Sequence, residues 1–268
     1  MEGTRFMKIY DIYDEDNSLD IGVLLYHEKS KSFMIELRSE LDEWTAPLLF
    51  ASFVKKEIYT IPREASLMWV RERVIPIGRQ NIGNILSTHK LKEYDEMKFL
   101  ELAQGRCSQD GLCIRKIDEL PEFVAERDAH NLVDCTALAG DFLLCFFKDK
   151  TVKKISLSDI ADFQGVDKVI ANRGLYESCS LGWGGYYVTF NDSIDIPSWI
   201  LYEKGRIIDV SYEDILTFIS KNIVDTTKAC ELLECTRQNL SYLVKQHNIE
   251  PVMTGVNGNL YLKSQITG

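Results

Sequence analysis

Residues 224–266 read VDTTKACELLECTRQNLSYLVKQHNIEPVMTGVNGNLYLKSQI and contain two short helical patterns in close succession. Thr226 or Thr227 is expected to cap the first helix and Thr236 the second, because a hydroxyl oxygen accepts hydrogen bonds from the unpaired amides of a first turn. Two short helices joined by a tight turn form a helix-turn-helix. The side chains expected to face inward are Ala229, Cys230, Leu232 and Leu233 in the first helix, and Leu240, Leu243 and Val244 in the second.

The second of these helices keeps a polar arc on its outer side. Arginine and glutamine can make paired hydrogen bonds to base edges, while lysine and tyrosine reach phosphates. This arc therefore predicts contact with double-stranded DNA. Its residues are Arg237, Gln238, Ser241, Tyr242 and Lys245.

A hairpin is expected directly after the two helices. Pro251 ends the helical stretch, and residues 256–259, Val-Asn-Gly-Asn, contain the Asn-Gly pair that is typical of a hairpin turn. The second strand is expected over 260–263. A hairpin in this place is a wing, and Asn259, Tyr261 and Lys263 are its expected contacts with DNA.

This stretch resembles the MerR and excisionase type of winged helix-turn-helix. The shared run is Thr227, Ala229-Cys230, Leu232-Leu233, Thr236 and the helix of residues 237–245. The resemblance implies DNA binding, and such modules usually work as dimers. Two features depart from the family: Glu234 stands where a turn glycine is usual, which strains the backbone, and the wing lacks the arginine that often follows its turn. A degenerate module that docks to a protein is the alternative.

The charge of the chain is distributed unevenly. The 268 residues hold 31 Lys and Arg against 41 Asp and Glu, a net charge of −10, but residues 222–268 hold four of each and are neutral. A neutral module makes few phosphate contacts and binds DNA weakly as a monomer, so a homodimer is expected. An amphipathic helix is expected over 211–223, with a capping box from Ser211 to Asp214. This helix either forms the contact between the two copies of the homodimer or packs on the middle domain of its own chain.

Residues 128–210 show short strands over 132–138, 142–147, 151–155, 177–181 and 185–190. They resemble the bacterial domain-of-unknown-function family 2442, which implies a small α+β module and supplies no catalytic residues. The aromatic residues near Trp183 are expected to pack in a core rather than to form a ligand surface. The Gly182–Gly185 run is expected to be a corner, because it matches no phosphate-loop spacing, and Asp192 and Asp195 are expected in turns.

Residues 1–120 begin with alternating apolar positions over 6–13, 21–26 and 33–37, which indicate a small antiparallel sheet followed by helices around 48–54, 67–70 and 82–86. Arg71, Arg73 and Arg79 lie close together, next to a helix start expected at Gly78, and could hold an anion or an acidic partner. Arg71 and Arg73 cannot share one helical face, so solvated positions paired with Glu64 or Glu72 are favoured.

Several classes are disfavoured. Seven cysteines at irregular spacing in apolar surroundings suit reduced thiols, and neither they nor the four histidines show a metal-ligand spacing. No nucleophile motif or phosphate loop is recognised, so neither an enzyme nor a cofactor is expected. The sequence shows neither a secretory signal nor a long apolar run, so no membrane association is expected. A cytoplasmic location is expected instead.

The sequence thus predicts an α+β protein of three parts, with boundaries at 1–120, 128–210 and 211–268 and a C-terminal winged helix-turn-helix. A transcriptional regulator that binds DNA through this module, with N-terminal parts that sense or bind a partner, is favoured. The alternative is a protein-interaction adaptor, of the antitoxin or immunity type, whose acidic domains bind a partner.

Overall fold

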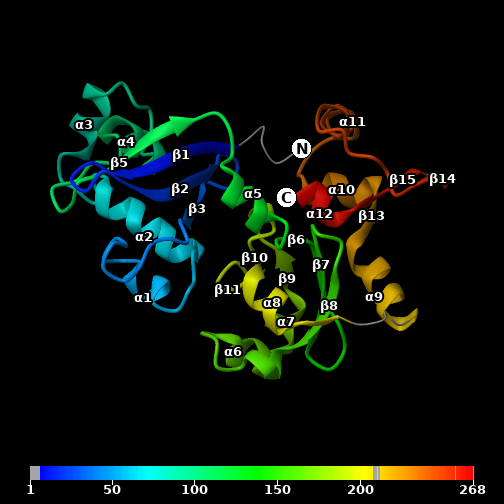
Figure 1. The fold of residues 1–268 in the computed structure, drawn as a ribbon. Helices are drawn as coiled ribbons and strands as arrows, with labels where there is room; N and C mark the ends of the chain where they lie inside the picture. The colour runs from blue at the N-terminus through cyan, green and yellow to red at the C-terminus, as the bar shows by residue number, and fades with distance from the viewer. Residues whose placement is uncertain (1–6, 208–209, 211, 257, 268) are drawn as a thin grey trace. The chain divides into compact units, whose positions relative to one another are not determined.

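The computed structural model describes residues 7–207, 210, 212–256 and 258–267 (Figure 1). The chain divides into two compact units, one up to Ala125 and the other from Glu126 onward. Both units combine short helices with small antiparallel sheets, which confirms the α+β class. The predicted boundary at 210–211 falls inside the second unit, where the middle strands and the C-terminal module each keep a hydrophobic core of their own.

The first unit is built on a five-stranded antiparallel sheet. The three strands expected from alternation are confirmed, and β1 is the neighbour of both β2 and β5. The last strand returns from far along the chain and was not expected. In the order β4-β3-β2-β1-β5, the strands are Thr60–Ile61, Ser32–Leu37, Leu19–His27, Met7–Asp14 and Leu112–Ile117.

Helices cover this sheet and close its core. The helix α2 lies against β3 and α4 (Figure 1). Its Trp69 is among the largest fully buried side chains. The helices expected around 48–54, 67–70 and 82–86 are present as α1, α2 and α3. The helices that begin in this part of the chain are α1 Ala51–Val54, α2 Arg63–Arg73, α3 Ile82–Thr88, α4 Glu96–Ala103 and α5 Glu122–Asp128.

Of the three arginines singled out in the sequence, Arg73 is buried and Arg71 has a different partner from those expected. The helix α3 begins at Ile82 rather than Gly78. Arg71 donates from Nε to Glu96 Oε1 at 2.8 Å, and Arg73 is buried, pairs with Asp110 and stacks on a tryptophan. Arg71 and Arg79 are exposed, as predicted, but Arg71 pairs with Glu96 rather than with Glu64 or Glu72. The prediction is wrong for Arg73, because a tertiary partner far along the chain buries it.

His27, at the end of β2, makes the stability of this unit depend on pH. Burial lowers its pKa to about 4, and its Nδ1 lies 2.7 Å from Ser30 Oγ. The unfolded chain binds the proton near pH 6.5 and the folded chain does not, so stability is present above pH 6.5 and lost as the pH falls toward 4. Between pH 7 and pH 5 we expect the unit to lose about 2 kcal/mol of unfolding free energy.

Hydrogen exchange of β2 amides in the full chain at the two pH values measures this loss. His27→Gln should remove most of it, whereas His89→Gln, at an exposed position in the same unit, should leave it intact. A loss of equal size in both variants would contradict the assignment to His27.

The second unit begins with two antiparallel sheets. The strands predicted at 132–138, 142–147, 151–155, 177–181 and 185–190 are all present. One sheet has the order β12-β8-β7-β6 and the other the order β11-β10-β9. The strands are β6 Leu132–Ala137, β7 Phe142–Phe147, β8 Val152–Ser156, β9 Cys179–Leu181, β10 Tyr187–Phe190, β11 Ile194–Pro197 and β12 Arg206–Ile207.

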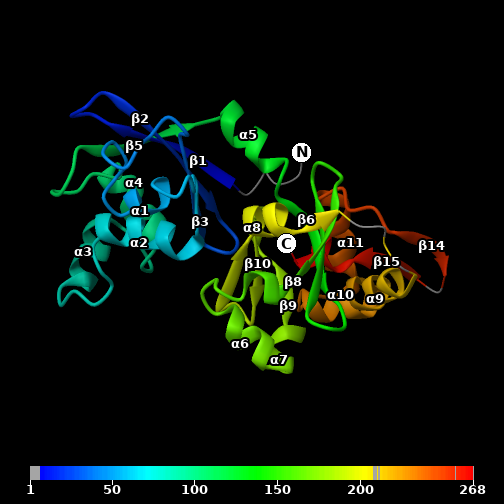
Figure 2. The same cartoon turned by 60° about the horizontal axis from the view of Figure 1, so that its bottom comes forward.

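Three short helices complete this part, and α6 and α7 lie side by side (Figure 2). Tyr176 of α7 is fully buried, and its hydroxyl lies 2.6 Å from the carbonyl oxygens of both Leu138 and Phe142, which share its one proton. One side chain thereby joins a helix to the turn between β6 and β7. The helices are α6 Val166–Ala171, α7 Arg173–Glu177 and α8 Ser198–Lys204.

The expectations for the aromatic and glycine residues are confirmed. Tyr186, Tyr187 and Phe190 are buried, and other aromatics pack around the same core. The run around Gly184 forms a short 3-10 turn that is kinked at Gly184, whose φ is +63°. Gly185 has φ +76°, and a Cβ there would collide with the carbonyl of Leu132. The run is therefore a corner held by close packing.

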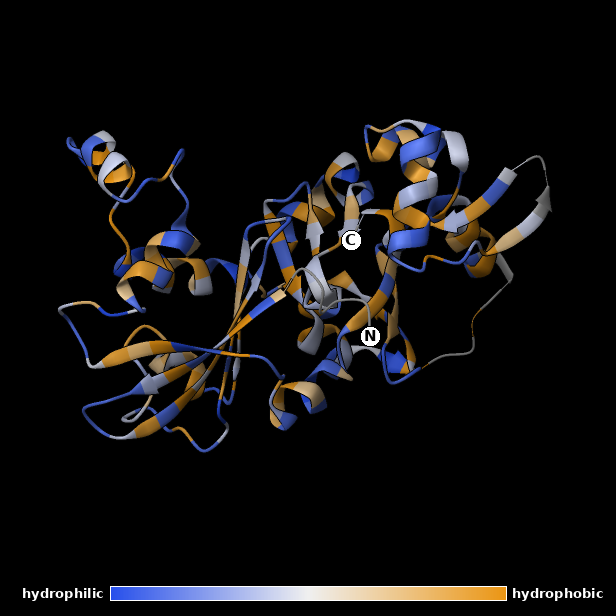
Figure 3. Cartoon of the chain, turned by 90° about the horizontal axis from the view of Figure 1, so that it is seen from above, coloured by the Kyte–Doolittle hydropathy of each residue, from blue (hydrophilic) through white to orange (hydrophobic). Residues whose placement is uncertain are grey.

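The C-terminal part of the second unit consists of α9 Tyr212–Asn222, β13 Ile223–Asp225, α10 Thr226–Leu232, α11 Arg237–Gln246, β14 Met253–Val256, β15 Gly258–Leu262 and α12 Lys263–Thr267. Its strands form a sheet of order β13-β15-β14. Figure 3 shows hydrophilic and hydrophobic residues mixed along the helices of the chain, as expected of amphipathic segments.

All seven cysteines are free thiols. Among the described residues, no group of three or more histidine, cysteine or acidic side chains is arranged to hold a metal ion. No described helix has both the length and the apolar character needed to cross a bilayer.

Candidate nucleic-acid interface

The two helices α10 and α11 begin at well-formed caps. Thr236 accepts from the amide of Asn239 at 3.2 Å, so the predicted cap of α11 is confirmed. The cap of α10 is Asp225, whose carboxylate accepts from the amide of Lys228 at 2.7 Å. The prediction of a threonine cap there is wrong, because an aspartate one residue earlier adds a negative charge at the positive helix terminus.

A tight turn joins α10 to α11. The amide of Cys235 donates to the carbonyl of Cys230 at 3.0 Å, and the amide of Glu234 donates to the carbonyl of Glu231 at 3.2 Å. This is the paired pattern of a Schellman motif, which usually places glycine at its left-handed residue. Glu234 occupies that residue with φ +48°, which confirms the predicted backbone strain.

Glu234→Gly is therefore expected to stabilise the C-terminal module by up to about 1 kcal/mol, since glycine adopts positive φ without a steric penalty. Hydrogen exchange of α11 amides measures the change. As a matched control, Glu231→Gly lies inside α10 and should destabilise by about 1 kcal/mol. A loss of protection in Glu234→Gly would show that the turn carries no strain.

The inner faces of the two helices meet in a small core. Ala229 and Leu240 are buried, together with residues from β13, β15 and α12, and most of the other predicted inward residues pack around them. Leu243 and Leu232 are the exceptions, and Leu232 has 36% of its surface exposed. Leu232 lies in the last turn of a short helix, where Leu233 takes the inward position instead.

The outer face of α11 carries all five residues predicted for DNA contact. Arg237, Gln238, Ser241, Tyr242 and Lys245 are exposed, and the tyrosine keeps 62% of its surface. Arg237 Nη2 donates to Thr227 Oγ1 at 3.3 Å, which fixes the start of α11 against α10. No ion pair of Arg237 or Lys245 occurs within the described residues, so both charges are available to a ligand.

The hairpin of β14 and β15 follows α11, but its predicted turn residue Asn257 lies outside the described residues. β15 also pairs with β13, so it is the central strand of the sheet. Tyr261 consequently lies in the core with 4% exposure, and its hydroxyl accepts from Asn259 Nδ2 at 3.1 Å. The prediction of Tyr261 as a DNA contact is wrong; its ring supports the hairpin from inside.

Lys263 is the first residue of α12 rather than the last of a strand. Burial raises the pKa of Asp134 on β6, and the hydroxyl of Ser264 and the charge of Lys263 partly offset this effect. Ser264 Oγ donates to Asp134 Oδ2 at 2.9 Å. Lys263 therefore lies where the C-terminal module meets the middle strands. The prediction that Lys263 contacts DNA from the wing is corrected accordingly.

The helix α9 packs on the middle strands of its own chain. Phe218 contacts the ring of Phe146 at 4.9 Å between centroids, and Lys221 Nζ donates to the carbonyl of Ala137 at 2.8 Å. Of the two alternatives for this helix, packing on its own domain is thus observed. The predicted capping residue Ser211 lies outside the described residues. Three apolar side chains of α9 stay 44–46% exposed: Ile215, Leu216 and Ile219.

Comparison with protein-family models, with curated proteins and with solved structures found no match.

Proposed function

We propose that the C-terminal module is a winged helix-turn-helix that binds double-stranded DNA and makes the chain a transcriptional regulator. The observation that carries this proposal is the outer face of α11, where a capped helix presents Arg237, Gln238 and Lys245 to solvent. Arginine and glutamine suit base edges in the major groove, and lysine suits phosphate. The hairpin of β14 and β15 takes the place of the wing.

The charge of the module supports a dimer. Lys228 is paired with Glu231 at 2.9 Å, and the charge of Lys263 acts on Asp134, whose pKa it lowers, so two cations of α11 remain for DNA. Each phosphate contact adds about one power of salt dependence and little affinity by itself. Two copies on adjacent half-sites would double these contacts. The exposed apolar face of α9 is the proposed contact between the copies.

A selection of genomic DNA fragments with the full chain, at low and moderate salt, tests the proposal. Enrichment of a sequence with two half-sites supports it. No enrichment, or retention unchanged in Arg237→Ala and Lys245→Ala, contradicts it. Capture of one stoichiometric basic protein without DNA would instead favour the adaptor function.

A further inference from the structure

The first unit contains a cavity of about 820 Å³ with an exposed apolar rim, which DNA binding does not use. Its walls come from the turn between β1 and β2, the segment before α1, the helix α2 and the segment before β5. At the rim, Trp44 is 86% exposed and Leu48 is 95% exposed. We call this rim, together with the cavity beside it, the Trp44 surface.

The apolar character of the rim continues into the cavity. Ile21 and Leu112 are buried in its lining, and Leu19 and Leu49 are partly buried there. Single exposed apolar side chains are common on proteins, but two at the mouth of an apolar cavity form a contiguous patch. Covering such a patch is favourable because apolar area leaves water. The Trp44 surface therefore suits apolar side chains of a partner.

The backbone of the rim is held in place by hydrogen bonds. The amides of Trp44 and Thr45 donate to Asp42 Oδ1 at 2.9 and 2.8 Å. The carbonyl of Pro47 accepts from the amide of Phe50 at 2.7 Å. A rim that is already ordered loses little conformational freedom when a partner binds, which favours affinity.

The charges of the lining restrict the partner. The lining holds three carboxylates, of Asp14, Glu72 and Asp110, and one guanidinium, that of Arg73. Arg73 pairs with Asp110, and neither Asp14 nor Glu72 forms an ion pair within the described part of the chain. The patch is therefore bordered by negative charge, which attracts lysine or arginine and repels carboxylates, phosphates and DNA.

The same charges disfavour a second copy of this chain as the partner. In a two-fold dimer the same patch lies on both copies. The Trp44 surface would then bring its carboxylates toward the same carboxylates of the other copy, which is repulsive. A different protein with cationic side chains meets no such repulsion.

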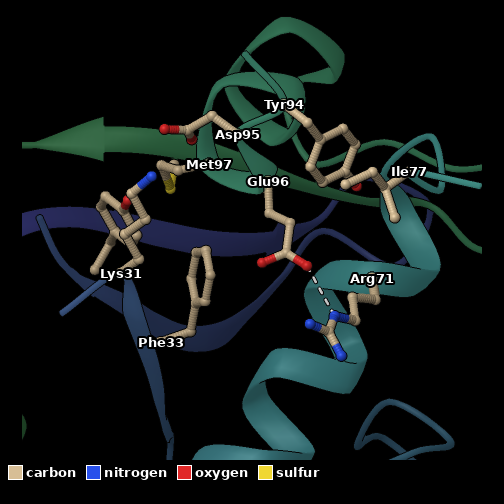
Figure 4. A pocket seen from close by; sticks show the side chains of 9 residues that line it. Lys31, Phe33, Arg71, Ile77, Tyr94, Asp95, Glu96 and Met97 are labelled. Carbon is tan, nitrogen blue, oxygen red and sulfur yellow. Dashed lines mark hydrogen bonds and ion pairs between the residues drawn. The ribbon is translucent and has the colours of Figure 1, made fainter. Parts of the chain in front are cut away.

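A second pocket in the same unit lacks this combination. It has a volume of about 220 Å³, and its arginine, Arg71, donates to Glu96 at 2.8 Å (Figure 4). Its two cations, Lys31 and Arg71, balance its two carboxylates, Asp95 and Glu96. Ile77, which also lines it, is 65% exposed. This pocket has an exposed apolar residue without the negative charge, so it serves as an internal comparison.

We propose that the Trp44 surface docks a segment of a partner protein in which apolar side chains are flanked by lysine or arginine. One apolar side chain of the segment enters the cavity, Trp44 and Leu48 pack on its neighbours, and the cations lie near Asp14 and Glu72. The surface belongs to the first unit, so this docking does not depend on whether α11 binds DNA.

The test uses the ¹⁵N-labelled full chain and three short peptides of equal length. The first combines leucine with lysine, the second replaces every lysine by glutamate, and the third replaces every leucine by serine. Titration with the leucine–lysine peptide should shift the indole N–H signal of Trp44, assigned by its loss in Trp44→Phe. The glutamate peptide should bind at least about tenfold more weakly because it is repelled. The serine peptide should leave the signal unchanged because it buries no apolar side chain.

Matched variants, measured by calorimetry with the leucine–lysine peptide, locate the site. Trp44→Ala should weaken binding about tenfold or more, as the loss of an interface tryptophan does. Leu48→Ala should weaken it about threefold to tenfold, whereas Ile77→Ala, at the smaller pocket, should not change it. Glu72→Gln should weaken it about threefold, whereas Glu64→Gln, in the first turn of the same helix, should not. All five positions are exposed, so the variants are expected to fold.

Four results would overturn the proposal. If the Trp44 signal does not move at up to about 1 mM of the leucine–lysine peptide, the surface does not dock such a segment. Equal affinity for the glutamate peptide refutes the charge argument, and an equal effect of Leu48→Ala and Ile77→Ala refutes the location. If sedimentation shows that Trp44→Ala separates a dimer of the chain into monomers, a second copy covers the surface instead.

Discussion

Arg237→Ala is expected to weaken binding to the selected DNA sequence about 5- to 150-fold, which corresponds to about 1–3 kcal/mol. Arg237 is the first residue of α11, and residues at the start of a recognition helix contact base edges in the major groove. Its guanidinium is exposed, is held at Thr227 and makes no ion pair in the described structure. Fluorescence anisotropy with the selected sequence and a scrambled one measures the loss.

The comparison variants separate base reading from charge. Lys245→Ala should weaken both DNA sequences alike and reduce the slope of log K against log salt by about one. Lys168→Ala removes the same charge from an exposed position of α6 and should change neither affinity. If Arg237→Ala and Lys168→Ala behave alike, α11 is not the reading element.

Tyr176→Ala is expected to cost about 3–5 kcal/mol of unfolding free energy in the second unit, as large-to-small changes of buried aromatic residues do. The ring is fully buried in the core of the middle strands. Its hydroxyl also serves two carbonyls at the turn between β6 and β7, so Tyr176→Phe should cost about 1–3 kcal/mol by leaving buried acceptors less satisfied.

Hydrogen exchange of β7 amides measures both losses without assuming that the two units unfold together. Tyr242→Ala removes the same side chain from a 62% exposed position and should stay within about 0.5 kcal/mol. Equal protection in Tyr176→Ala and Tyr242→Ala would mean that Tyr176 does not hold this core together.

The sequence correctly predicted those helices and strands that are indicated by a pattern of neighbouring residues. Strict alternation found β1, β2 and β3, and the Thr236 cap with the apolar positions behind it found α11. The strand β5 was missed because its second half carries Arg115 and Lys116, which are exposed and give no alternation.

Residues whose role depends on distant partners could not be predicted. In Leu260-Tyr261-Leu262 either face of the strand can be the buried one, and a shift of one residue exchanges the faces. Only the pairing of β15 with β13 decides that Tyr261 points inward. The local sequence around Arg73 is typical of a surface residue. Its burial depends on Asp110, which lies 37 positions later in the chain and pairs with it in the fold.

The free thiols can report local opening of the hydrophobic cores without any substitution in the chain. None of the seven is exposed: Cys107 and Cys113 lie in the first unit, Cys135, Cys145 and Cys179 in the middle strands, and Cys230 and Cys235 in the C-terminal module. A thiol reagent reaches the three buried thiols, Cys113, Cys135 and Cys145, when their surroundings open, whereas the other four are partly exposed in the folded chain. Mass spectrometry of the peptides alkylated over time would therefore report the opening of the first unit at Cys113 and that of the middle strands at Cys135 and Cys145, in the native sequence and within one sample.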